Sequence, residues 1–175
     1  MDKRKQILRL SRNAVMLALL CVIGMFSLPL GDNIKVSLQL LMVFIIGLTS
    51  VSFIDAIIVT GLYLVIGLLI PVYAGFTASV TPTFGFVISF VVLVIPLYFL
   101  NKLPIKSQFV RMAIACVVGL LVCYAIGTTF LALYLKLNIQ KALLIAVVPY
   151  IPFDIAKIII AILVVSLLPK RSSSL

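Results

Sequence analysis

The chain has 175 residues, of which 65% are hydrophobic and 10% charged, and its formal net charge is +10. A soluble domain is only roughly 45–50% apolar, so this composition indicates an integral membrane protein. We predict a single membrane domain over residues 1–175, with no room for a soluble domain. The chain lacks His, paired carboxylates and a G-x-x-x-x-G-K-[ST] loop. These absences argue against an enzyme, an ATPase, a metal site or another cofactor.

Six apolar segments come near the roughly 20 residues that a helix needs to cross a bilayer core. They are residues 11–28, 34–50, 53–70, 83–100, 111–134 and 152–169. We therefore predict an all-α membrane protein, folded as a bundle of six transmembrane helices. Only residues 49–52 separate the second and third segments, so a five-helix bundle with one re-entrant segment is the alternative.

The first segment follows a cluster of basic residues, as the apolar part of a signal peptide does. No small-residue cleavage site follows it and the run is long enough to span, so we interpret it as a membrane helix. It contains Ala14 and Ala18, a small-xxx-small pair that allows close helix approach. The contact would be another helix of the bundle or a separate subunit, although Ala-rich helices often contain such pairs by chance.

Most of the positive charge lies on one side of the predicted bundle. With the N-terminus inside, ten of the 14 Lys and Arg fall on the cytoplasmic side, and Lys35, Lys136 and Lys141 fall outside. This bias predicts a multi-pass protein of the plasma membrane with both termini in the cytoplasm. The same cations would contact anionic lipid headgroups, an explanation that we favour over nucleic-acid binding.

Several polar groups lie in or beside the apolar segments. Gln39, in the second segment, would either bond a neighbouring helix or serve a ligand. Asp55 lies at the inner end of the third segment and would cap it or meet a basic partner. Tyr124 and Thr128 share one face of the fifth segment, although Thr hydroxyls often bond only their own helix. Residues 71–82 are too broken by Pro and Gly to span, so we expect them to pack over the bundle or a ligand.

The strongest candidate site is the pair Asp154 and Lys157 at the start of the last segment. Residues three apart share a helix face, and the positive end of the helix dipole would stabilise Asp154 there. Each charge costs roughly 2.5–3.5 kcal/mol near the centre of a membrane helix. We therefore expect the pair to bind a small polar molecule. The alternative is that the two charges only neutralise each other.

Five segments resemble, in order, motifs of the BioY family, the biotin-binding membrane subunits (S components) of energy-coupling factor (ECF) transporters. The segments and the motifs that they resemble are 31–39 (GPVPITLQ), 62–75 (LYLLLG…LPVFAGG), 81–86 (GPTGGY), 124–131 (YALGTPWL) and 148–157 (LPFLPGDLLK). Together these matches cover most of the chain.

The resemblance implies an ECF S-component-like bundle that binds biotin in a pocket at the outer face. Uptake would require a transmembrane coupling subunit and two cytoplasmic ATPase subunits. The A-x-x-x-A pattern of Ala14 and Ala18 would dock the coupling subunit. The substrate-binding residues that the resemblance implies are Gln39, Tyr73, Thr83, Gly85, Tyr124, Tyr150, Asp154 and Lys157.

The motifs depart from the family at Phe84 and Phe153, where the family has Gly. Because glycine lets a backbone approach a ligand closely, the added bulk would favour another small carboxylate, such as lipoate or a biotin precursor. Three further functions are compatible with a small membrane bundle: a stand-alone proton-coupled carrier with Asp154 as its proton site, a purely structural membrane subunit and an intramembrane enzyme acting on lipid. The lack of His and of paired acids counts against the enzyme.

Overall fold

The computed structural model describes residues 3–29 and 35–168. These residues form, in chain order, α1 (Lys3–Met25), β1 (Ser27–Pro29), β2 (Lys35–Ser37), α2 (Gln39–Thr49), α3 (Phe53–Leu69), α4 (Phe84–Leu100), α5 (Gln108–Tyr134), α6 (Ile139–Ala146), the 3-10 helix η1 (Val148–Tyr150) and α7 (Ile151–Leu167). The start of the first matched motif, residues 31–34, and the basic residues Lys170 and Arg171 lie outside the described residues.

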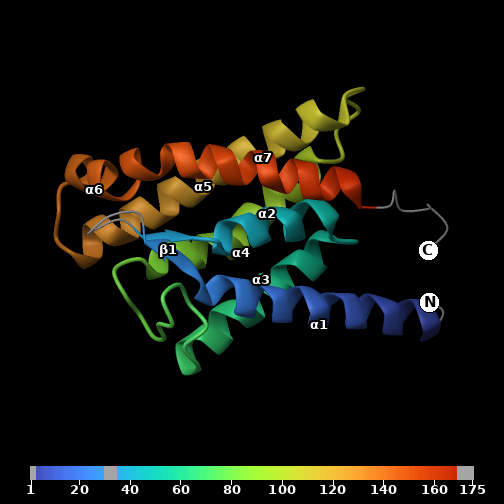
Figure 1. The fold of residues 1–175 in the computed structure, drawn as a ribbon, viewed down its shortest axis with the longest axis horizontal. Helices are drawn as coiled ribbons and strands as arrows, with labels where there is room; N and C mark the ends of the chain where they lie inside the picture. Colours follow the sequence, from blue (N-terminus) through green and yellow to red (C-terminus); the bar gives the residue numbers. More distant parts are fainter. Residues whose placement is uncertain (1–2, 30–34, 169–175) are drawn as a thin grey trace.

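The long helices lie side by side along the length of the molecule (Figure 1). α1 begins and α7 ends at one end of the bundle, which we call the terminal end. The β1–β2 hairpin, the connection 70–83 and α6 gather at the other end, which we call the hairpin end. The connection 70–83, which the sequence predicts to pack over the bundle or a ligand, therefore lies at the same end as the hairpin and α6.

α2 forms the centre of the bundle, where it packs against α1, α3, α4, α5 and α7. Gln39, Leu40 and every residue from Met42 to Leu48 are buried. A helix that is apolar all round is typical of a buried position. The core cluster extends from α2 to the inner faces of the surrounding helices, with Tyr63 of α3 and Leu93 of α4 fully buried.

The helix predicted over residues 34–50 is wrong in its first part. Residues 35–37 instead form β2, which pairs antiparallel with β1 through Ser27 and Ser37, Leu28 and Val36, and Pro29 and Lys35. Val36 is buried, and the Gln39 backbone N–H donates to Ser37 Oγ at 3.0 Å. Because this side-chain bond satisfies an N–H at the helix start, α2 begins at Gln39 and has only 11 residues.

The other five predicted helices correspond to α1, α3, α4, α5 and α7, and α1 ends earlier than predicted, at Met25, because β1 follows it. α6, whose first turn is capped by the Asn138 side chain, was not predicted from the sequence. Three helical stretches are long and apolar enough to cross a membrane: Lys3–Met25, Gln108–Tyr134 and the α6–α7 run Ile139–Leu167. α2, α3 and α4 are shorter apolar helices, so six full-length spans is an approximate description.

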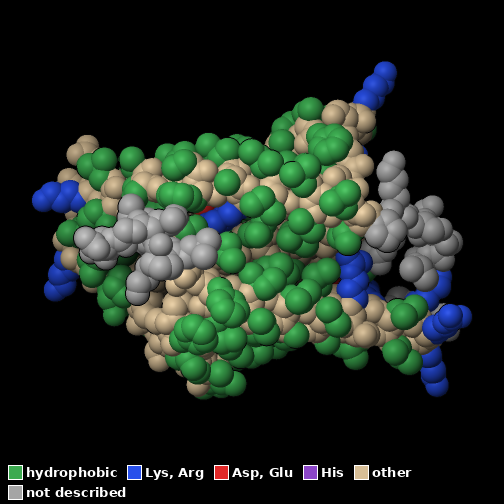
Figure 2. All heavy atoms as spheres, viewed as in Figure 1, with side chains coloured by type: hydrophobic (Ala, Val, Ile, Leu, Met, Phe, Trp, Pro, Cys, Tyr) green, Lys and Arg blue, Asp and Glu red, His purple; other side chains and the backbone are tan. Residues whose placement is uncertain are grey.

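The outside of the bundle is apolar. Figure 2 shows hydrophobic side chains over most of one face, with Lys and Arg side chains mainly near its two ends. Exposed side chains such as Leu69, Leu133 and Leu167 are 75–84% accessible. Soluble proteins rarely expose contiguous apolar patches of such extent, and the chain is a multi-pass membrane protein. On α1, Ala14 and Ala18 are both exposed.

Candidate ligand-binding site

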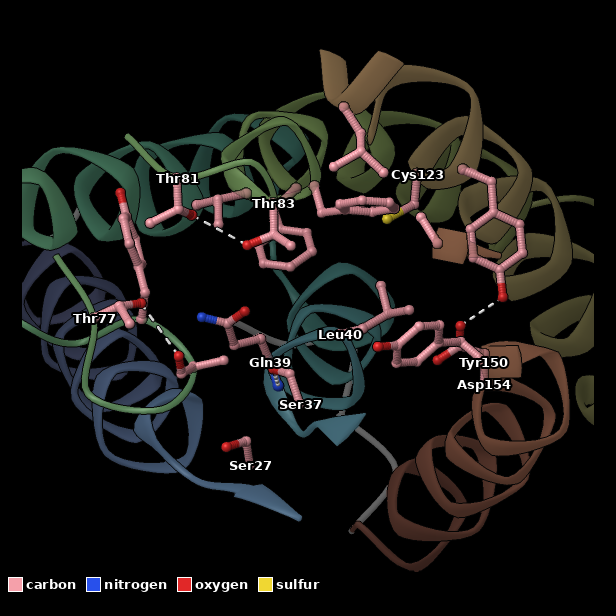
Figure 3. Close-up of a pocket in the computed structure, with 18 of the residues that line it drawn as sticks. Ser27, Ser37, Gln39, Leu40, Thr77, Thr81, Thr83, Cys123, Tyr150 and Asp154 are labelled. Carbon is pink, nitrogen blue, oxygen red and sulfur yellow. Dashed lines mark hydrogen bonds between the residues drawn. The ribbon is translucent and has the colours of Figure 1, made fainter. Parts of the chain in front are cut away.

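A cavity of about 520 Å³ lies at the hairpin end of the bundle. This volume is within the range of small-molecule sites, ~300–1,000 Å³. Every described helix and strand except α1 and α3 contributes to its wall, as does the connection 70–83. Figure 3 shows Gln39 and Leu40 of α2 between Thr77 on one side and Tyr150 and Asp154 on the other.

Asp154 and Lys157 lie near the start of α7 and both line the cavity. They are 4% and 7% exposed. The Lys157 ammonium donates to Asp154 Oδ1 at 2.7 Å, which confirms that the two side chains share a helix face. The Tyr124 hydroxyl of α5 donates to Asp154 Oδ2 at 2.5 Å. Because an ammonium has three donors, Lys157 keeps further N–H groups for a molecule in the cavity.

Gln39 brings a buried amide to the cavity from the first residue of α2. Its Nε2 donates to the Tyr63 hydroxyl of α3, which in turn donates to the Val72 carbonyl at 2.9 Å. The side chain therefore bonds a neighbouring helix and also faces the cavity, so both interpretations of Gln39 hold geometrically. The amide oxygen receives no hydrogen bond from the described residues, which leaves an acceptor at the cavity wall.

The connection 70–83 packs on the bundle and contributes Tyr73, Thr77 and Thr83 to the cavity wall. Tyr73 and Thr77 exchange backbone hydrogen bonds of 3.0 and 3.3 Å, and Gly75 provides the turn between them at φ 74°. The Tyr73 hydroxyl donates to the Leu64 carbonyl at 2.6 Å. Burial raises the pKa of Tyr73 to about 12, and its hydrogen bond to Leu64 fixes the connection to α3.

The structure brings seven of the eight predicted substrate-binding residues to this cavity: Gln39, Tyr73, Thr83, Tyr124, Tyr150, Asp154 and Lys157. The eighth, Gly85, does not line it. A Cβ at Gly85 would lie 2.2 Å from Phe130 Cβ, so this glycine serves the close packing of α4 on α5. Phe84 and Phe153 are also outside the lining. Their bulk therefore does not narrow the cavity directly.

Several residues of the cavity wall were not predicted from the sequence. Ser27 and Ser37 reach it only because the hairpin forms, and Ile145 and Ala146 only because α6 folds over it. The wall of α4 and α5 also contributes residues that appear in the sequence as ordinary apolar positions; they are Phe86, Val87, Phe90, Cys123 and Leu131. No local signal marks such residues, since only the packing of distant segments brings them together.

Asp55 is the other buried carboxylate among the described residues, and it lies at the terminal end. Of the two interpretations of Asp55, a helix cap or a residue paired with a basic side chain, the structure shows the second. Arg9 Nε of α1 lies 2.9 and 2.7 Å from its two carboxylate oxygens, and Asn13 Nδ2 donates to Oδ1 at 2.9 Å. Ser52, not Asp55, caps α3. These bonds fasten α1 to α3, and Asp55 does not line the cavity.

Comparisons with known proteins identify the family and the fold of the chain. The family model described as "BioY family" matches residues 1–174. The curated protein "Biotin transporter BioY" of Thermotoga maritima is 28% identical over 166 residues, which cover 93% of this chain and 96% of that protein. A crystal structure described as the S-component for biotin from an ECF-type ABC transporter superposes with a TM-score of 0.86 at 22% identity, covering 98% of this chain and 96% of the other. The chain described here belongs to the BioY family.

Proposed function

We propose that this chain is the S component of an ECF-type importer and that it binds biotin in the cavity at the hairpin end. The observation that carries the proposal is the buried pair of Asp154 and Lys157 in the cavity wall. A buried charge pair is costly, and here it borders an open volume of small-molecule size. Membership of the BioY family makes the chain a transport component rather than an enzyme.

The cavity offers groups that match both ends of biotin. Lys157 suits the carboxylate, because a buried cation with free donors favours a negative charge. Gln39, on a different helix, supplies an acceptor for the N–H groups of a ureido ring, while Asp154 holds the Lys157 ammonium in place. Aromatic and aliphatic side chains, including Phe86 and Phe90, would pack against the apolar parts.

The exposed surfaces support a proposal for the partners and for the orientation in the membrane. α1 presents Ala14 and Ala18 outward, which suits docking of a transmembrane coupling subunit that works with two cytoplasmic ATPase subunits. The described cations Lys3, Arg4, Lys5, Lys102 and Lys106 belong to the terminal end. We propose that this end faces the cytoplasm and anionic lipid headgroups, with both chain termini on that side and the cavity facing outward.

Isothermal titration calorimetry on detergent-purified protein tests the ligand. Biotin should bind saturably with one site per chain, and dethiobiotin and lipoate serve as competitors for the same site. Biotin methyl ester is the matched control, because it lacks the negative charge that Lys157 would meet. We expect the ester to bind more weakly than biotin. Absence of heat with biotin, dethiobiotin and lipoate, at protein concentrations that detect micromolar binding, would overturn the proposal.

A further inference from the structure

Two aromatic side chains of the cavity wall rest directly against glycines of neighbouring helices. A Cβ at Gly127 of α5 would lie 2.3 Å from Phe86 Cδ1, and a Cβ at Gly67 of α3 would lie 1.9 Å from Tyr73 Cε1. Carbon atoms in contact lie ~3.5–4.0 Å apart, so each approach is too short by about 1 Å or more for any side chain larger than hydrogen. Each ring therefore occupies space that only glycine leaves open.

We propose that Gly127 determines ligand specificity by letting Phe86 lie back against α5, which sets the width of the cavity. Gly127 itself does not line the cavity, whereas Phe86 does. It lies one turn after Cys123, a lining residue on the same face of α5 (Figure 3). The Phe86 ring thus lies between Gly127 and the cavity. The choice of biotin as the ligand rests on the function proposed above.

Adding a methyl group at Gly127 would move the ring rather than separate the two helices. The Ser89 hydroxyl of α4 hydrogen-bonds the Cys123 thiol of α5, Oγ to Sγ 3.1 Å, and this bond lies one turn from the glycine. Further along the interface, Gly119 of α5 closely approaches Leu97 of α4. These two contacts, Ser89 with Cys123 and Leu97 with Gly119, therefore hold α4 and α5 together.

The ring of Phe86 borders the cavity, which gives it open volume to move into. Besides Cδ1, its Cε1 and Cγ would lie 2.4 and 2.6 Å from the added Cβ, so the whole ring must rotate and not only its tip. The Phe86 carbonyl accepts a hydrogen bond from Ser89 Oγ at 2.5 Å, which holds the backbone in place. Rotation then carries the ring away from α5 and into the cavity, where it would exclude a fused two-ring ligand more strongly than a single ring.

The test is Gly127→Ala, with Gly61→Ala as the matched control. Gly61 also lies inside a helix, but a Cβ there meets nothing within 4 Å. By calorimetry, Gly127→Ala should weaken biotin binding by about 10- to 100-fold, the range expected when one methyl group overpacks a filled site. The loss for dethiobiotin, which has one ring, should be smaller. Gly61→Ala should keep wild-type affinity for both ligands.

Rescue separates this effect from general damage to the fold. In a Phe86→Ala background no atom beyond Cβ remains to meet the added methyl group, so Gly127→Ala should there change biotin affinity by less than about threefold. Equal loss in both backgrounds would overturn the proposal, as would wild-type affinity of the single variant.

If wild-type protein binds none of the ligands, the proposed function fails. A crystal structure of ligand-free Gly127→Ala still decides this inference: Phe86 rotated into the cavity supports it, and separated helices contradict it.

Discussion

The two ends of the bundle each bury a carboxylate, and the two carboxylates have similar burial but different surroundings. Asp55 at the terminal end is 3% exposed and Asp154 at the hairpin end is 4% exposed. Each is bonded to a cation at 2.7 Å. Asp55 receives its bonds from Arg9 and Asn13 across the α1–α3 contact, and it does not line the cavity at the hairpin end.

Asp154, in contrast, is bonded by residues that themselves line a cavity, Lys157 and Tyr124. Burial and ion pairing alone therefore do not identify a binding site in this protein. What separates the two pairs is the open volume beside one of them. The following predictions test this contrast, in order of decreasing effect on affinity or stability, with each matched variant placed beside its partner.

The largest effect is expected for Lys157→Met. The substitution keeps an extended side chain but removes the cation, so Asp154 stays buried with the Tyr124 hydroxyl as its remaining partner. Loss of one partner of a buried charge–charge contact with a ligand costs about 2–5 kcal/mol of binding free energy, so biotin affinity should fall by about 100-fold or more in calorimetry. Size-exclusion chromatography should show that the variant remains monodisperse. Affinity within about threefold of wild type would mean that the pair is structural, like Asp55 and Arg9.

Asp55→Asn should show the opposite pattern. The amide keeps the shape of the carboxylate but weakens the bonds from Arg9 and Asn13. Charged hydrogen bonds contribute about 1.5–3 kcal/mol, and Arg9 is partly exposed, so the loss should lie at the low end of that range. We expect a lower melting temperature in detergent and biotin affinity within about twofold of wild type.

Asp154→Asn is the matched variant for this measurement, because it makes the same chemical change at the hairpin end. It should weaken biotin binding. If Asp55→Asn weakened binding as strongly as Asp154→Asn, the two ends would be coupled and the contrast between them would fail.

The smallest effect is expected for Phe153→Leu. Phe153 precedes Asp154 in the chain and differs from the glycine of the family's motif, but it does not line the cavity. Biotin affinity should therefore change by less than about twofold, as for a tolerated hydrophobic exchange. Tyr150→Leu, at a residue that does line the cavity, should reduce affinity more. A larger loss at Phe153 than at Tyr150 would show that the first turn of α7 moves when ligand binds.

The sequence was sufficient to predict the long helices, because predominantly apolar segments of 17 or more residues, such as α3, α4 and α5, have few alternatives in a membrane. The β1–β2 hairpin was not predictable in the same way. Its strands have three residues each, which is too short for an alternating pattern to appear. The eight-residue α6 was not predicted, because it is short and the prolines that follow it are typical of a loop.

Part of the candidate site was predictable and part was not. Asp154 and Lys157 were predictable because placing their charges at membrane depth costs free energy. The resemblance to the BioY family added Tyr73, Thr83 and Tyr150. Phe86 gave no such signal, since its role depends on contact with Gly127, 41 positions further along the chain. Contacts of that kind arise from packing and have no counterpart in local composition.

The short central helix has a consequence for how the protein fits its membrane. Eleven residues of α-helix rise only about 16 Å, roughly half of a ~30 Å hydrocarbon core. A lipid-facing helix of that length would thin or distort the surrounding bilayer. α2 avoids this mismatch because other helices surround it and separate it from the lipid tails. The depth that α2 leaves unfilled is available for a ligand, while α1, α5 and the α6–α7 run are still long enough to cross the bilayer.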